Sequence, residues 1–204
     1  MTTDALAQPE AFVTPAAWAT AQLGNLDELL LEQAHLEKEA AAGAVAIPFR
    51  LPLEPRLHRQ LSALAREELV HFERTLKLLS SRGVAFAAQS SSGYAEQLKK
   101  KVRKELADRL VDELLVAAVI ERRSHERMTL LAAATAAQHP EVAAFYADLC
   151  PAEERHERLY LDLATLVCDA DSVRSRYGEL VRHEARVLGG LPFSARLDSG
   201  LPDA

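Results

Sequence analysis

The sequence predicts an all-α protein, with a bundle of four long helices followed by one additional C-terminal helix. Apolar residues recur at three- and four-residue intervals, which is typical of amphipathic helices, and no stretch alternates in the manner of a strand. Hydrophobic residues make up 49% of the 204 positions and aromatic residues only 5%, a composition that favours helices around a sizeable core. Glycine and proline are sparse, so the helices are expected to be long.

The first half of the chain predicts two of these helices. Residues 1–20 are expected to form a flexible N-terminal arm. The first helix begins near Asn25, a residue suited to an N-cap, with acidic residues in its first turn, and it ends near Ile47. Three prolines follow, and the last, Pro55, suits the first turn of a second helix that ends at the Ser-Ser-Arg-Gly sequence of residues 80–83.

The second half predicts the remaining long helices. A connection rich in alanine and serine leads to a basic helical stretch from Tyr94 and then to a long third helix reaching about Ala134. The pair His139-Pro140 opens a fourth helix. This helix extends to about Val167, and Pro151 is expected to interrupt or kink it.

A fifth helix is expected at roughly residues 171–188. The remaining residues include several glycines and prolines, so they are expected to form a poorly ordered tail. The predicted organisation is therefore a flexible arm at residues 1–20, a helical bundle at residues 21–188 and a disordered tail at residues 189–204.

Charge and composition exclude several classes of protein. The formal net charge is −6, so no overall positive field draws the chain to nucleic acid or membranes. Two cysteines, Cys150 and Cys168, cannot form a disulfide framework or a four-thiolate metal site. The longest apolar run, Leu114–Ile120, is too short to cross a bilayer, and the N-terminus lacks the features of a secretory signal. We therefore expect a cytoplasmic protein without a membrane anchor.

Two Glu-x-x-His pairs lie on helix faces that are predicted to be buried. They are Glu68/His71 in "EELVHFE" and Glu153/His156 in "AEERHERLY". Residues three, four and seven positions apart share a helix face, and the positions around both glutamates on these faces are largely apolar or aromatic. A buried carboxylate is protonated, paired or bound to a cation, so both pairs are candidate metal ligands.

Two further carboxylates occupy apolar faces of the other long helices. Glu37 precedes Glu68 by 31 residues, and Glu121 precedes Glu153 by 32, which indicates one helical hairpin used twice in the chain. Four carboxylates and two imidazoles facing one bundle interior are the ligand set of ferritin-like di-iron and di-manganese proteins. We therefore predict a ferritin-like bundle whose metal ligands are Glu37, Glu68, His71, Glu121, Glu153 and His156.

The chemistry of these residue types supports that prediction. Four carboxylates in a dry interior repel one another, and two divalent cations neutralise them. Oxygen donors with one imidazole per metal favour iron, with manganese as the alternative. A third pair, Glu32/His35, lies on a more polar helix face, and we predict that Glu32 is solvated.

The sequence resembles a known family, the bacterial tRNA-(2-methylthio-N6-isopentenyladenosine) hydroxylases, commonly called MiaE. The resemblance extends from about Leu23 to Val167 and is carried by "HLEKEAA", "EELVHFERTLKLLSSRGV", "LVDELLVAAVIERRSHERM" and "FYADLCPAEERHERLYLDLA". It implies a ferritin-like di-iron monooxygenase that uses dioxygen to hydroxylate the isopentenyl chain of a modified adenosine in tRNA. The six predicted ligands match the family's ligand positions. The sequence departs from the family's usual pattern at Glu39, at residues 122–127 and at Pro151.

The resemblance also implies partners. These are tRNA and an electron-transfer reductase or ferredoxin that supplies the external electrons, and we expect a monomer or dimer. One local cluster of positive charge is suited to RNA phosphates, although an ordinary solvated helix face explains it equally well. The cluster contains Lys99, Lys100, Lys101, Arg103, Lys104 and Arg109.

Four residues near the predicted ligands have both a functional and a structural interpretation. His125 lies one turn after Glu121 and either orients that carboxylate or packs at the core edge. Tyr146 and Tyr160 share the face of Glu153 and either donate hydrogen bonds near bound oxygen or pack in the core. Cys150 either lines the site or is a small buried side chain.

Other functions remain open at the level of the residues. A ferritin-like di-iron or di-manganese oxygenase, oxidase or catalase with a non-RNA substrate would use the same ligands. A non-enzymatic iron-binding or storage protein is a second alternative. A metal-free interaction bundle is the third, and it would require other partners for the inward glutamates.

Overall fold

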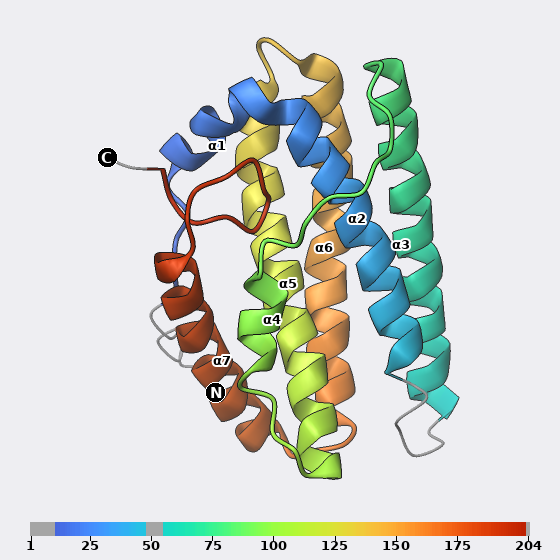
Figure 1. The fold of residues 1–204 in the computed structure, drawn as a ribbon. Helices are drawn as coiled ribbons and strands as arrows, with labels where there is room; N and C mark the ends of the chain where they lie inside the picture. The colour runs from blue at the N-terminus through green and yellow to red at the C-terminus, as the bar shows by residue number, and fades with distance from the viewer. Residues whose placement is uncertain (1–10, 48–54, 203–204) are drawn as a thin grey trace, which may run out of the picture.

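The computed structural model describes residues 11–47 and 55–202, and every regular element in these ranges is helical. Figure 1 shows the long helices packed side by side as an elongated bundle. In chain order the elements are α1 (Ala16–Gln22), the 3-10 turn η1 (Leu23–Asn25), α2 (Leu26–Ala46), α3 (Pro55–Ser81), α4 (Tyr94–Lys99), α5 (Leu106–Thr135), α6 (Pro140–Thr165) and α7 (Ala170–Gly190).

Two helical hairpins make up the bundle. Helices α2 and α3 form the first hairpin and α5 and α6 the second, and they lie side by side in Figure 1. Helix α7 packs against the outer side of α5, and the short helix α4 contacts both α5 and α7. The predicted four-helix bundle with one additional C-terminal helix is therefore confirmed.

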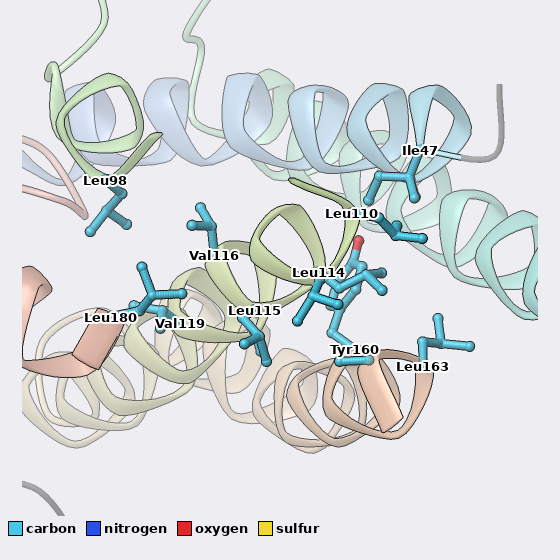
Figure 2. Close-up of a cluster of buried hydrophobic side chains, with 14 of the residues drawn as sticks. Ile47, Leu98, Leu110, Leu114, Leu115, Val116, Val119, Tyr160, Leu163 and Leu180 are labelled. Atoms are coloured by element: carbon cyan, nitrogen blue, oxygen red, sulfur yellow. The ribbon is translucent and has the colours of Figure 1, made fainter. Parts of the chain in front are cut away.

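The hydrophobic core consists of two clusters, one toward each end of the bundle. Figure 2 shows part of the first cluster, in which Leu114 of α5 lies near Tyr160 of α6 and Val119 of α5 lies near Leu180 of α7. The second cluster joins the N-terminal part of α2 to the C-terminal parts of α3 and α5 and the N-terminal part of α6. The middle turns of the four long helices lie between these clusters, and most of the buried residues there are polar.

Helix boundaries largely follow the sequence signals, with one difference. The basic stretch and the long third helix are separate elements, since α4 ends at Lys99 and α5 begins at Leu106. Helix α6 continues through Pro151, so the predicted interruption does not occur. A proline removes one backbone hydrogen bond, and the buried side chains on either side of Pro151, Leu149 and Ala152, stabilise the helix through packing instead.

Both ends of the described chain pack more tightly than their composition indicates. Trp18, in the predicted arm, is fully buried, and its Nε1 donates a hydrogen bond of 3.1 Å to Ser199 Oγ in the predicted tail. Leu197 is also fully buried, and Gln22 Nε2 donates to the carbonyl of Ser194 at 2.9 Å. The two end segments therefore bury each other against the bundle. The predictions for residues 1–10 and 203–204 lie outside the described residues.

None of the described helices combines the length and the apolar character that crossing a membrane requires.

Candidate metal centre

The six predicted ligands converge between the two core clusters. Glu37 comes from α2, Glu68 and His71 from α3, Glu121 from α5, and Glu153 and His156 from α6. All six are buried, and none has more than 5% of its surface exposed. The convergence follows from helix periodicity, because each Glu-x-x-His pair presents both side chains on the inward face of one helix.

Glu68 lies at the centre of this group. Its Oε2 is 3.2 Å from His71 Nδ1, and its Oε1 is 2.8 Å from His156 Nδ1. Glu37 Oε2 is 3.6 Å from the same nitrogen of His71. One carboxylate therefore lies between two imidazoles that belong to different hairpins.

Two sets of donor atoms are compact enough to surround cations. Within each set the ligand atoms lie within 4.8 Å of one another, and Glu68 belongs to both sets. A carboxylate shared by two sets is suited to bridge two ions. The first set contains Glu37, Glu68, His71 and Glu153, and the second contains Glu68, Glu121 and His156.

The cluster binds protons strongly when no cation is present. Burial raises the pKa of Glu37 and Glu121 well above the usual value for glutamate, and neighbouring carboxylates raise both further. Burial and the Glu68 charge raise the pKa of Glu153 to about 7. Burial also opposes the ionisation of Glu68, but the imidazoles of His156 and His71 outweigh it and lower its pKa to about 2. Divalent cations would replace these protons as the source of positive charge.

Several potential metal-ligand atoms at the centre have no hydrogen-bond partner among the described residues. They are Glu68 Oε1, Glu153 Oε1 and His156 Nδ1, and all are buried. The 2.8 Å approach of Glu68 to His156 is an ion-pair contact whose angles do not make a hydrogen bond. Buried polar atoms are rarely left unpaired, so these donors fit a site built for cations. Carboxylate oxygens with one imidazole per set suit iron or manganese.

Two residues that were not predicted from the sequence support the ligands. Gln33 Nε2 donates a 2.7 Å hydrogen bond to Glu37 Oε1 from one turn earlier in α2. Glu67 Oε2 lies 3.1 Å from His156 Nε2, which leaves Nδ1 of that ring toward the centre. A carboxylate that holds the outer nitrogen of a histidine fixes its orientation for a metal. The helical spacing of Gln33 was a usable signal, whereas Glu67 lies on another helix from His156 and gave none.

The other predicted neighbours occupy different places around the centre. His125 Nδ1 lies 3.0 Å from the carbonyl oxygen of Cys150, so its contact joins α5 to α6 and does not involve Glu121. Tyr146 is fully buried, and its hydroxyl has no hydrogen-bond partner among the described residues. Tyr160 is also buried and borders a cavity next to the centre, and burial together with Glu121 raises its pKa well above that of a free tyrosine.

The prediction that Glu32 is solvated was wrong. Glu32 is only 5% exposed, and it accepts a hydrogen bond from the backbone N–H of Leu197. Burial raises its pKa well above the usual value, and Asp198 raises it further. The C-terminal segment covers this part of α2, and a contact between residues 165 positions apart has no local signal in the sequence.

The cavity has a volume of about 840 Å³ and leads from the carboxylates toward the protein surface between α2 and α5. Glu37, Glu68, Glu121 and Glu153 all border it. Its walls are largely apolar along the two helices, with Ala40 and Gly43 on α2, Ile47 directly after α2, and Val116, Ala117 and Ile120 on α5.

The predicted basic cluster lies partly at this cavity. Lys99, Arg103, Lys104 and Arg109 border it. Arg103 is paired with Asp112 and Asp108, however, and Arg109 Nε donates to Glu113 at 2.9 Å. Lys100 Nζ donates to Gln97 at 2.7 Å, and Lys101 is exposed. The lysines of the cluster are therefore exposed, whereas its two arginines are held by carboxylates of α5.

A four-helix bundle with a buried Glu/His cluster that could hold metal ions at the centre of its core places the chain in the ferritin-like class. The family described as tRNA-(MS[2]IO[6]A)-hydroxylase (MiaE) matches residues 4–199, and the chain belongs to that family.

Individual relatives agree with this assignment. A protein of Pseudomonas putida called tRNA 2-(methylsulfanyl)-N(6)-isopentenyladenosine(37) hydroxylase is 37% identical over 192 residues, which cover 94% of this chain and 92% of the relative. A protein of the same name from Salmonella typhimurium is 33% identical over 155 residues, which cover 75% of this chain and 55% of that longer relative.

A solved structure is similar over nearly the whole chain. It is Protein 43 with aldehyde deformylating oxygenase activity from Synechococcus, with 36% sequence identity and a TM-score of 0.88. The match covers 97% of this chain and 98% of that one. The ferritin-like fold predicted from the sequence is thus confirmed by comparison as well as by the helices themselves.

Proposed function

We propose that this protein is a non-haem di-iron monooxygenase that hydroxylates the isopentenyl side chain of 2-methylthio-N6-isopentenyladenosine in tRNA. One observation carries the proposal: the Glu/His cluster lies at the inner part of an apolar cavity whose rim includes lysines. The relatives named as hydroxylases of this nucleoside support the same substrate.

The six convergent side chains would hold two iron ions, and Glu68 belongs to both compact sets of ligand atoms. Bound iron would supply the oxidising power for inserting one atom of dioxygen into a C–H bond, while the other atom leaves as water with two external electrons and two protons. An electron-transfer reductase or ferredoxin would provide those electrons. The protein's own contribution is to hold the ligands, exclude water from the cavity and align the substrate.

The two parts of the cavity suit the two parts of the substrate. A five-carbon isopentenyl chain is apolar and fits the alanine, valine and isoleucine walls that lead to the cluster. RNA phosphates are anionic and suit Lys99 and Lys104 at the rim. The net charge of −6 does not oppose this arrangement, because the contact depends on a local positive surface.

Mass spectrometry of tRNA nucleosides from cells with and without the gene tests the proposal. We expect the hydroxylated nucleoside to disappear and its isopentenyl precursor to accumulate when the gene is deleted. An unchanged level of hydroxylated nucleoside, with precursor present, would overturn the tRNA assignment.

The aldehyde deformylating oxygenase activity of the similar Synechococcus protein suggests a useful second arm for this test. Purified iron-loaded protein with a reductant is given either precursor tRNA or a long-chain aliphatic aldehyde. The proposal expects hydroxylated nucleoside from the tRNA. Hydrocarbon and formate from the aldehyde, without any nucleoside product, would instead favour a non-RNA substrate for the same apolar cavity.

A further inference from the structure

A buried carboxylate organises the basic segment at the cavity rim. Asp112 of α5 has no exposed surface. Its Oδ2 accepts hydrogen bonds from the backbone N–H and Nε of Arg103, at 2.8 and 3.0 Å, and Nη2 of the same arginine donates to Oδ1 at 2.8 Å. Arg176 of α7 donates from Nε and Nη2 to the two oxygens, both at 2.9 Å.

The same arrangement also fixes the backbone of the segment that connects α4 to α5. Residues 100–105 have no regular structure, so their path depends on contacts with the rest of the protein. Arg176 Nη2 donates to the carbonyl oxygen of Lys101 at 2.6 Å, and Asp112 accepts from the backbone N–H of Arg103. Both hydrogen bonds connect this basic segment to helices of the bundle.

Opposite charges on Asp112 and the two arginines stabilise these hydrogen bonds. Burial opposes the ionisation of Asp112, but hydrogen bonds from Arg103 and Arg176 outweigh it and lower the pKa of this carboxyl. Asp112 is therefore ionised at neutral pH, and each guanidinium forms two-pronged contacts with it. Arg103 is turned toward this carboxylate, whereas Lys101 and Lys104 remain exposed.

We infer that Asp112 is a positioning residue for RNA: through Arg103 and Arg176 it holds the 100–105 segment so that its exposed lysines meet phosphates. The inference rests on the proposed tRNA substrate and adds how the rim recognises it. The lysines make the phosphate contacts, and Arg103 is committed to the segment's conformation. Asp112 does not touch the reacting atoms, so it should affect RNA binding and not the oxidation step.

The effect of Asp112→Asn on RNA affinity distinguishes a positioning role of Asp112 from a purely electrostatic one, because the two roles predict opposite changes. The substitution Asp112→Asn removes a negative charge near the RNA surface, so electrostatics alone predicts tighter RNA binding. Positioning predicts weaker binding, because the asparagine cannot hold two guanidinium groups. A second substitution, Arg176→Lys, keeps the charge but loses the forked donor that reaches both Asp112 and Lys101.

The experiment measures the dissociation constant of iron-loaded protein for isopentenylated tRNA at one fixed salt concentration. The matched control is Asp108→Asn, which removes a half-exposed carboxylate that also pairs with Arg103. We expect Asp112→Asn and Arg176→Lys each to raise the dissociation constant about tenfold. The control should leave it unchanged or lower it.

A second readout uses the free modified nucleoside, which has no flanking phosphates. Its hydroxylation rate and the iron content should be the same in wild type and in all three variants. Tighter or unchanged tRNA binding by both Asp112→Asn and Arg176→Lys would overturn the inference, as would equal losses for tRNA and nucleoside with iron retained. If Asp112→Asn does not fold, Arg176→Lys alone decides. Failure of wild-type protein to bind tRNA at all would instead overturn the proposed function.

Discussion

Glu68 Oε1 lies 2.8 Å from His156 Nδ1, although the two residues belong to different hairpins and are 88 positions apart in the sequence. The contact joins the two halves of the centre, because Glu68 also lies 3.2 Å from His71 of its own helix. The centre is therefore a property of the assembled bundle, and neither hairpin forms it alone.

The orientation of His156 should depend on Glu67. We expect Glu67→Gln to lower iron affinity about tenfold or more, because it removes the charged acceptor at His156 Nε2. Competition with a chelator measures this effect. Glu154→Gln is a matched control, because Glu154 lies on the exposed side of α6 and pairs with Arg158. Equal affinities in the two variants would contradict a role for Glu67.

The stability of the metal-free protein should fall as the pH rises. Glu153 has a folded pKa of about 7 against an ordinary value of 4.5, so the stability it provides is present below pH 4.5 and is lost as the pH rises through 7. Burial opposes protonation of His71, but Glu37 and Glu68 raise its pKa from 6.5 to about 10. Its contribution is present below pH 6.5 and is lost as the pH rises through 10.

Metal loading should reverse this dependence. Cations compete with protons for the same donors, so metal binding stabilises the fold more as the pH rises. Thermal unfolding of both forms between about pH 5.5 and about pH 8.5 checks the prediction, with a gap in Tm that widens with pH. A constant gap would show that the cluster does not exchange protons for metal.

Gly43 lines the cavity on α2, so the size of its side chain determines how wide the cavity is at this point. A Cβ atom built at this position meets nothing within 4 Å beyond its own helix backbone, so Gly43→Ala should be tolerated. It should stabilise the helix by about 1 kcal/mol, because glycine is a poor helix former. Gly43→Leu should instead fill the apolar part of the cavity and lower turnover severalfold with iron content unchanged. Full turnover by the leucine variant would place the substrate elsewhere.

The packing of the chain ends should contribute measurably to stability. Trp18 is fully buried, and Cζ of Arg127 lies 4.6 Å from the centroid of its ring. Its Nε1 donates a hydrogen bond to Ser199 Oγ. We expect Trp18→Ala to lower the free energy of unfolding by about 3–5 kcal/mol. Val13→Ala, at a position that is 75% exposed, should change it by no more than about 0.5 kcal/mol. Denaturant unfolding measures both changes in the free energy of unfolding. Equally small changes in the two variants would mean that the packing of Trp18 does not contribute to stability.

The convergence of the six side chains could be predicted because its signals in the sequence are local. The spacing between Glu68 and His71, and between Glu153 and His156, identifies one inward face per helix. The remaining features depend on contacts between distant segments. Glu32 was expected to be solvated because its helix face is polar, whereas in the structure the distant segment around Leu197 covers it. The hydrogen bonds of Asp112 with Arg103 and Arg176 likewise join separate segments, and no helix-propensity argument reveals them.

Metal analysis of purified, iron-loaded protein tests the central claim most directly. The wild type should contain about two iron ions per chain, and the double variant Glu68→Ala/Glu153→Ala should lose most of them while Glu154→Ala retains them. Iron content that is unchanged in the double variant, or a wild type that takes up no iron, would contradict the proposed centre.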